Sequence, residues 1–139
     1  MEEIKKYDEN SNLVYRRDSS GFEYWYDSNN RLLHYKNSSG DEWWYEYDER
    51  GNMVHHKDSN GYEFWKEYDS KDRLIHHKDS KGYNFWKEYD VNSRLTHCKD
   101  SRGYEVLREY DQNDSTIIVK TYMKGDAHEG SIFLSTKID

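Results

Sequence analysis

The sequence predicts an all-β protein, an antiparallel meander of about ten strands built from five 21-residue hairpin repeats. Three observations predict this fold. A Tyr-Asp pair recurs at a fixed period, every copy contains two turn signals, and the segments between the turns alternate aromatic and charged residues. The pairs are Tyr7-Asp8, Tyr26-Asp27, Tyr47-Asp48, Tyr68-Asp69, Tyr89-Asp90 and Tyr110-Asp111, and the last four are spaced 21 residues apart.

The turn chemistry divides each copy into two strands. Residues 58–61, 79–82 and 100–103 read Asp-Ser-x-Gly. An Asp that hydrogen-bonds the backbone, followed by a Gly that adopts positive φ, predicts a type I turn closing into a bulge, and therefore a tight hairpin. The second connection, at 48–52 or 69–73, reads as a polar loop of similar length. Strands of about six to eight residues remain between these turns.

Alternation assigns the side chains of each strand to two faces. In the strand at 83–89, one face holds Tyr83, Phe85, Lys87 and Tyr89, and the other holds Asn84, Trp86 and Glu88. Neither set is purely apolar. We expect either a slender sheet with both surfaces sparsely covered, or a sheet that curls so that one side is partly enclosed.

Composition indicates a thin fold stabilised by aromatic residues. Hydrophobic residues make up 33% of the chain, and 14 Tyr, 5 Trp and 4 Phe provide about half of them. So high an aromatic content in fixed register is not typical of disorder. We expect a single repeat domain over 1–139, with an N-terminal cap and partial repeat at 1–19, repeats at 20–111 and a C-terminal cap at 112–139. That cap is predicted to be a hairpin of strands 115–122 and 131–136 around a loop at 124–130.

The charge balance favours a protein partner. The chain has 28 acidic and 21 basic residues, a net charge of −7, and its lysines alternate with glutamates instead of forming a basic patch. Direct nucleic-acid binding is therefore not expected, whereas an acidic surface suits a basic protein. No signal-peptide core and no apolar run of 18 residues is present, and the single Cys98 has no partner for an internal disulfide. We expect a cytoplasmic protein that binds no membrane.

Histidines recur at equivalent positions of the repeats. His34, His55, His76 and His97 form this histidine column, with His56 and His77 beside it. Equivalent positions of a meander lie two strands apart, about 10 Å, which is too far for one shared metal ion. We predict no metal site and no cofactor. We expect instead solvated or stacked imidazoles whose protonation near pH 6 changes the charge.

Candidate binding residues come from an aromatic and an acidic series on the second strand of each copy. They are Tyr24, Trp43, Phe64, Phe85, Glu46, Glu67 and Glu88. Exposed aromatic rings beside carboxylates suit a protein interface, and also suit stacking on a sugar or a cation. One aromatic series must serve as core because little else is apolar. We assign that role to Trp25, Trp44, Trp65 and Trp86.

One copy resembles a known repeat. The run from Gly82 to Leu95 resembles the YD repeat of Rhs and teneurin-type proteins: a Gly, an aromatic residue four positions on, Tyr-Asp, a short turn and Arg-Leu. The match recurs from 40 to 53 and from 61 to 74, so the resemblance covers 20–111. It implies β-hairpins in spiralling arrays, which in Rhs proteins wall a cocoon around a toxin. Here the usual turn glycine remains only at Gly51, and the array is too short to enclose a toxin. Choline-binding and MORN repeats are more distantly similar.

The function predicted from the sequence is a non-catalytic protein-binding module. No nucleophile triad, phosphate-binding loop or metalloprotease motif is present, so no catalytic residue is predicted. An acidic inhibitor or antitoxin-like protein that covers a basic surface, for example of a nucleic-acid-handling enzyme, is the favoured form. We expect a homodimer, since a sheet with a sparse core hides apolar surface by self-association. The alternatives are a carbohydrate or cell-wall-binding repeat protein and a structural scaffold.

Overall fold

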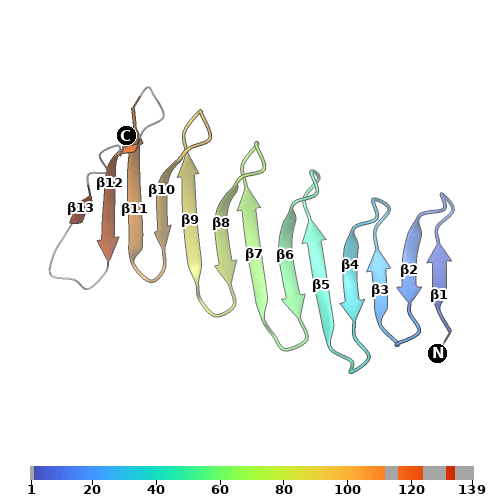
Figure 1. Ribbon diagram of the computed structural model, residues 1–139. Coiled ribbons are helices and arrows are strands. Elements are labelled where there is room, and N and C mark those ends of the chain that lie inside the picture. Colours follow the sequence, from blue (N-terminus) through green and yellow to red (C-terminus); the bar gives the residue numbers. More distant parts are fainter. Residues whose placement is uncertain (1, 112–115, 124–130, 134–139) are drawn as a thin grey trace. The chain divides into compact units, whose positions relative to one another are not determined.

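The computed structural model describes residues 2–111, 116–123 and 131–133. Within these ranges it contains thirteen β-strands and no helix (Figure 1). The strands are β1 (Ile4–Tyr7), β2 (Leu13–Arg17), β3 (Glu23–Tyr26), β4 (Leu32–Lys36), β5 (Glu42–Tyr47), β6 (Met53–Asp58), β7 (Glu63–Tyr68), β8 (Leu74–Asp79), β9 (Asn84–Tyr89), β10 (Leu95–Asp100), β11 (Tyr104–Tyr110), β12 (Thr116–Met123) and β13 (Ser131–Phe133).

The predicted antiparallel meander is confirmed. The chain divides into two compact units, residues 1–66 and 67–139, and each is described by itself. In each unit consecutive strands pair antiparallel, in the order in which they occur in the chain. β2 to β11 are the ten strands of the five hairpins, and the described residues add β1, β12 and β13. The single domain expected from chain length stays a prediction, and the loop expected at 124–130 lies outside the described residues.

The first turn of each repeat has the predicted geometry. At 79–83, the Gly82 N–H donates to the Asp79 carbonyl oxygen at 3.1 Å, and the Asp79 N–H donates to the Tyr83 carbonyl oxygen at 2.9 Å. Gly82 has a φ of 86°. Asp79 Oδ1 accepts the N–H groups of Lys81 and Tyr83, which fixes the turn from within. This is a type I turn followed by a residue in the left-handed region.

The second turn is the same turn with a different residue at its strained position. At 90–94, the Ser93 N–H donates to the Asp90 carbonyl oxygen at 3.0 Å, and the Asp90 N–H donates to the Arg94 carbonyl oxygen at 2.9 Å. Ser93 has a φ of 67°. From the sequence, only a polar loop was expected here. The positive φ falls on Gly51 in one repeat, whereas the other second turns place it on Ser11, Asn30, Asp72 and Ser93.

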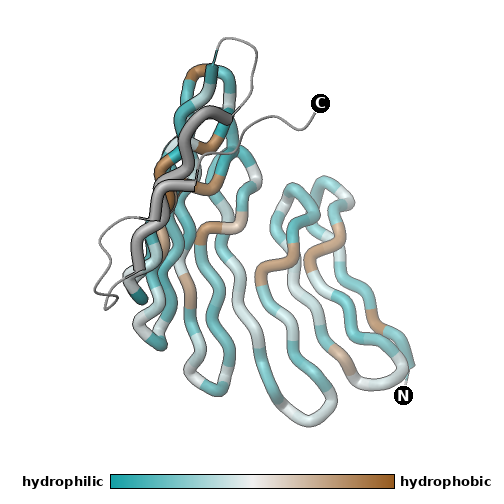
Figure 2. The backbone as a smooth tube through the Cα atoms, turned by 60° about the vertical axis from the view of Figure 1, so that its left-hand side comes forward, coloured by the Kyte–Doolittle hydropathy of each residue, from teal (hydrophilic) through white to brown (hydrophobic). Residues whose placement is uncertain are grey.

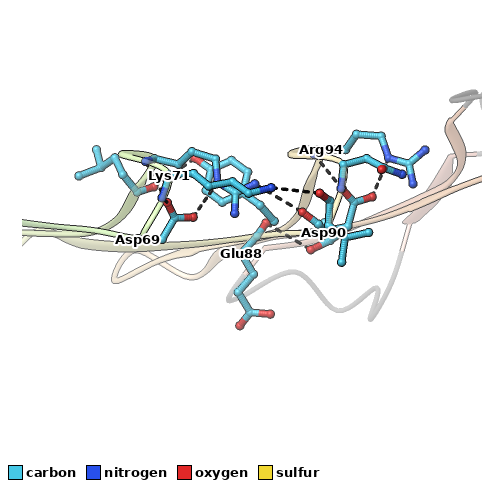
Figure 3. Close-up of polar contacts among 11 residues, drawn as sticks. Asp69, Lys71, Glu88, Asp90 and Arg94 are labelled. Carbon is cyan, nitrogen blue, oxygen red and sulfur yellow. Dashed lines mark hydrogen bonds and ion pairs between the residues drawn. The ribbon is translucent and has the colours of Figure 1, made fainter.

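An arginine clasp links successive second turns, which explains the Tyr-Asp and Arg-Leu pairs of the repeat. Arg94 Nε donates to Asp90 Oδ2 at 2.6 Å within its own turn (Figure 3). Its guanidinium also lies 4.6 Å from the ring centroid of Tyr110 in the next hairpin. The Tyr110 hydroxyl donates to the Leu95 carbonyl oxygen at 2.7 Å. Arg31 and Arg73 make the same set of contacts, so the motif occurs at three of the second turns.

The sheet has almost no buried interior in its described part. Val106 is the one apolar side chain there that is buried, at 4% exposure. Figure 2 shows hydrophobic residues as short segments separated by hydrophilic ones, as the sequence composition leads one to expect. Rings stacked across neighbouring strands and the hydrogen bonds of the turns therefore do much of the stabilising that a core provides in a thicker fold.

Candidate functional site

The two faces of each unit carry different chemistry. Trp44 of β5 stacks on His34 of β4 with ring centroids 5.0 Å apart, on what we name the Trp–His face. Its neighbour Trp43 stacks on Tyr35 at 5.0 Å, on the opposite Tyr–Phe face. This separation follows from the alternation of side chains along a strand. In the second unit, Trp86 and Phe85 of β9 separate in the same way.

The three predicted glutamates lie on the Trp–His face and are largely exposed. The side chains of Glu46, Glu67 and Glu88 are 70%, 68% and 71% exposed. Each extends beside an imidazole of the histidine column. We name these three residues the exposed glutamates. On the same face, Trp44 and Trp86 are each 38% exposed.

Members of the histidine column connect these glutamates to the neighbouring strands. His55 lies between two carboxylates, with Nδ1 at 3.0 Å from Glu46 and Nε2 at 2.8 Å from Glu63. In the second unit, His97 lies between Glu88 at 3.4 Å and Glu105 at 2.7 Å. The imidazoles are about one-fifth exposed, at 20% and 18%. The expected stacking is present at His55, whose ring stacks on Trp65 at 5.3 Å.

The exceptions to this pattern are informative. His34 lies between Trp25 and Trp44, at centroid distances of 4.2 and 5.0 Å, because β3 is two residues shorter and places an indole where later copies have a glutamate. His76 contacts Glu67 at 3.1 Å, but its buried Nε2 has no hydrogen-bond partner among the described residues. At that place the chain has Asn84 where other copies have Glu.

Two adjacent histidines have opposite electrostatic surroundings. Burial lowers the pKa of His55, but the hydrogen bonds that its ring donates to the Glu46 and Glu63 carboxylates outweigh burial and raise the pKa above its ordinary value. His56, on the Tyr–Phe face, has its pKa lowered chiefly by burial. Only the Trp–His face therefore favours the imidazolium at this point of β6.

The predicted aromatic row lies on the Tyr–Phe face. It consists of Tyr24, Trp43, Phe64 and Phe85, all half-buried. Phe85 stacks on His77 at 5.2 Å, and Lys87 Nζ lies 5.2 Å from the same ring centroid. Phe64 has the equivalent stacked imidazole and lysine, and Tyr24 lies against a tyrosine ring and an arginine. Much of each ring face is thus in contact with the chain itself.

The candidate residues therefore do not form one site. The exposed glutamates and the aromatic row occupy opposite faces, because positions such as 43 and 46 differ by an odd number along a strand. The expectation that the Trp series is the core was wrong at Trp44 and Trp86, which are among the more exposed large side chains. What the structure brings together is Trp, His and Glu on one face. The recurrence of His two positions after Met53, Leu74 or Leu95 was the signal in the sequence.

Two further kinds of site are absent from the described residues. No group of three or more His, Cys, Asp or Glu side chains there is arranged to hold a metal ion. The described part of the chain also has no helix of the length and hydrophobicity that crossing a membrane requires.

Comparison with known proteins identifies the repeat. The family model described as RHS Repeat matches residues 26–63, which extend from the end of β3 to the start of β7. This segment of the chain is similar to an RHS repeat. A comparison with curated proteins finds no match.

Solved structures share the fold of this chain. A crystal structure of TcdB2-TccC3-TEV aligns with a TM-score of 0.57 and 17% identity over 85% of the chain. A structure of the Photorhabdus luminescens Tc holotoxin pore aligns with a TM-score of 0.62 and 11% identity over 94%. TcdB2-TccC3 without its hypervariable C-terminal region gives a TM-score of 0.55 and 17% identity over 85% of the chain. The alignments span 7%, 9% and 7% of those solved chains. At these identities the likeness shows the fold alone.

Proposed function

We propose that this chain is a non-catalytic module that binds a basic surface of a partner protein through the Trp–His face of its units. The observation that carries the proposal is the exposure of Glu46, Glu67 and Glu88, each about two-thirds or more, beside the exposed Trp44 and Trp86. Exposed carboxylates attract a cationic surface over several ångströms, and partly exposed tryptophans supply contact area once it arrives.

The aromatic rings support a protein partner over a carbohydrate. A sugar that binds by stacking needs an open ring face. On the Trp–His face, Trp86 has a stacked imidazole at 5.1 Å and Lys99 Nζ at 5.6 Å from its centroid. Trp44 has His34 on one side and is opposite Lys57 in the register on the other. Rings packed in this way present their edges outward, and edges suit an apolar protein surface better than a pyranose face.

The structural relatives support a second candidate. The matched chains belong to TcdB2-TccC3 complexes and a Tc holotoxin, which are multi-protein assemblies, and the alignments cover only a small part of each. A scaffold element that shapes a larger assembly is consistent with this likeness.

The specific form of the binding proposal is an inhibitor or antitoxin-like protein of the cytoplasm. The net charge of −7 supports the binding of a basic partner. A homodimer stays a prediction, tested by light scattering at micromolar concentration.

The binding proposal is tested with a cationic probe and a variant of matched charge. Poly-L-lysine is passed over the immobilised chain, and the association rate is measured at about 50 mM and about 500 mM salt. The variant Glu46→Lys, Glu67→Lys and Glu88→Lys is compared with Glu2→Lys, Glu9→Lys and Glu49→Lys, which changes net charge equally at exposed positions elsewhere.

The experiment has three outcomes with different meanings. The proposal expects association that is slowed by salt and by the first variant, and much less by the second. Equal slowing by both variants means that net charge alone attracts the probe and that no particular face docks it. No binding by the folded wild-type chain favours the scaffold candidate.

A further inference from the structure

The carboxylate contacts of two histidines match a protonated ring. An ionised carboxylate only accepts hydrogen bonds, and a neutral imidazole has one donor nitrogen and one acceptor nitrogen. His55 faces a carboxylate at each nitrogen, at 3.0 and 2.8 Å. His97 does so at 3.4 and 2.7 Å. Only the imidazolium donates at both positions, so loss of the proton turns a nitrogen lone pair toward a carboxylate oxygen.

The other charged groups around these rings leave the carboxylates dominant. On β6, Lys57 lies on the same face two positions from His55, opposite Glu63 of β7 in the register. The other neighbours of His55 in the register are Glu46 of β5 and the uncharged Trp65 of β7. Among the described residues, each exposed glutamate thus contacts one imidazole, which is a cationic partner when it is protonated and not when it is neutral.

The same contacts hold in the second unit. His97 has Glu88 on β9 and Leu107 on β11 as its neighbours in the register, and Glu105 reaches its second nitrogen. Lys99, two positions along β10, is opposite Glu105. His76 contacts Glu67 and stacks on Trp86, with Lys78 two positions along β8.

We propose that protonation of His55, His76 and His97 regulates the binding surface of the Trp–His face by pairing the exposed glutamates within the chain. This inference rests on the proposed function, since it concerns the same carboxylates. At a pH above the titration range of the histidines, the glutamates are available to a cationic partner. At a pH below that range, each glutamate is paired with the imidazolium beside it. The formal net charge follows the same direction, because the chain has seven histidines and a net charge of −7 with all of them neutral.

The test measures affinity for poly-L-lysine by calorimetry at about pH 7.5 and about pH 5.8, a range in which lysine and glutamate side chains keep their charges and histidine does not. The wild-type chain is expected to bind about fivefold to tenfold more weakly at the lower pH, as competition from three exposed ion pairs implies. The variant His55→Gln, His76→Gln and His97→Gln, in which glutamine still donates to glutamate, is expected to change by less than about twofold. Equal wild-type affinity at both pH values overturns the proposal, as does an undiminished pH dependence in the folded variant.

A second measurement keeps this inference separate from the proposed function. The titration of His55 is followed by NMR through its Cε1 proton in the wild-type chain and in the variant Glu46→Gln. A lower midpoint in the variant supports the internal pairing even if poly-L-lysine binds at neither pH, a result that would reject only the proposed function. An unchanged midpoint shows that Glu46 does not stabilise the protonated form of His55, and the proposed regulation is then wrong.

Discussion

The non-glycine residues at positive φ predict that a turn substitution stabilises the protein. Ser93 has a φ of 67°, whereas the equivalent turn of another repeat has Gly51 at 91°. A non-glycine residue in the left-handed region costs about 1 to 2 kcal/mol, and glycine returns part of this through the larger entropy of the unfolded chain, about 0.5 to 1 kcal/mol. Ser93→Gly is therefore expected to stabilise by about 0.5 to 1 kcal/mol, a rise of about 2 to 4 °C in the unfolding midpoint.

A neighbouring substitution provides the matched control. Asn92 lies in the same turn, one position earlier, and is not among the residues with positive φ. Asn92→Gly therefore relieves no strain and adds freedom to the unfolded chain, which costs about 0.4 to 1 kcal/mol. Thermal and urea unfolding of both variants, compared with the wild type, gives the sign of each change in the free energy of unfolding. A neutral or destabilising Ser93→Gly, or the same sign for both variants, would refute the argument that the second turn stores backbone strain.

Three further predictions follow from side-chain contacts. Tyr89→Phe removes a hydrogen bond to the main-chain carbonyl of Leu74 on the other strand of the same hairpin, and urea unfolding should show a loss of about 1 kcal/mol. Asn84→Glu gives the buried Nε2 of His76 a carboxylate partner, and thermal unfolding at about pH 6 should show a gain of a few tenths to about 1 kcal/mol. Because the pKa of His55 is raised, its stabilising contribution is complete below about pH 6.5 and is lost as pH rises through the folded-state value. Glu46→Gln should flatten the stability profile at pH values above the ordinary His pKa of about 6.5, whereas an unchanged slope contradicts the pairing.

Most of the fold could be predicted from the 21-residue period and from the turns that contain glycine. The Asp-Ser-x-Gly segments predict the first turn correctly because glycine at the positive-φ position is visible in the sequence. The second turn was not identified because serine, asparagine or aspartate holds that position, at Ser93 for example. The left-handed conformation there is imposed by the paired strands on either side, which a local pattern does not contain.

The residues of the candidate site could be predicted from the sequence, but their distribution over the two faces could not. Glu46 and Trp43 were expected to act on one surface, although three positions along a strand place them on opposite faces. The Trp series was assigned to a core, but the sheet has one layer, so Trp44 is stacked and still 38% exposed. The pairing of His55 with Glu46 and Glu63 depends on register across three strands, which the spacing within one strand does not determine.

The central claim is that a cationic partner docks on the Trp–His face and not on the Tyr–Phe face. The chain has five tryptophans, and Trp43 and Trp44 are adjacent in sequence but stack on opposite faces. The indole N–H resonances of the five can be followed by two-dimensional NMR while poly-L-lysine is added at about pH 7.5, where most histidines are neutral. The account predicts that the signals of Trp44 and Trp86 shift with saturation and that the signal of Trp43 does not. A saturable shift of Trp43 with Trp44 and Trp86 unmoved would contradict it.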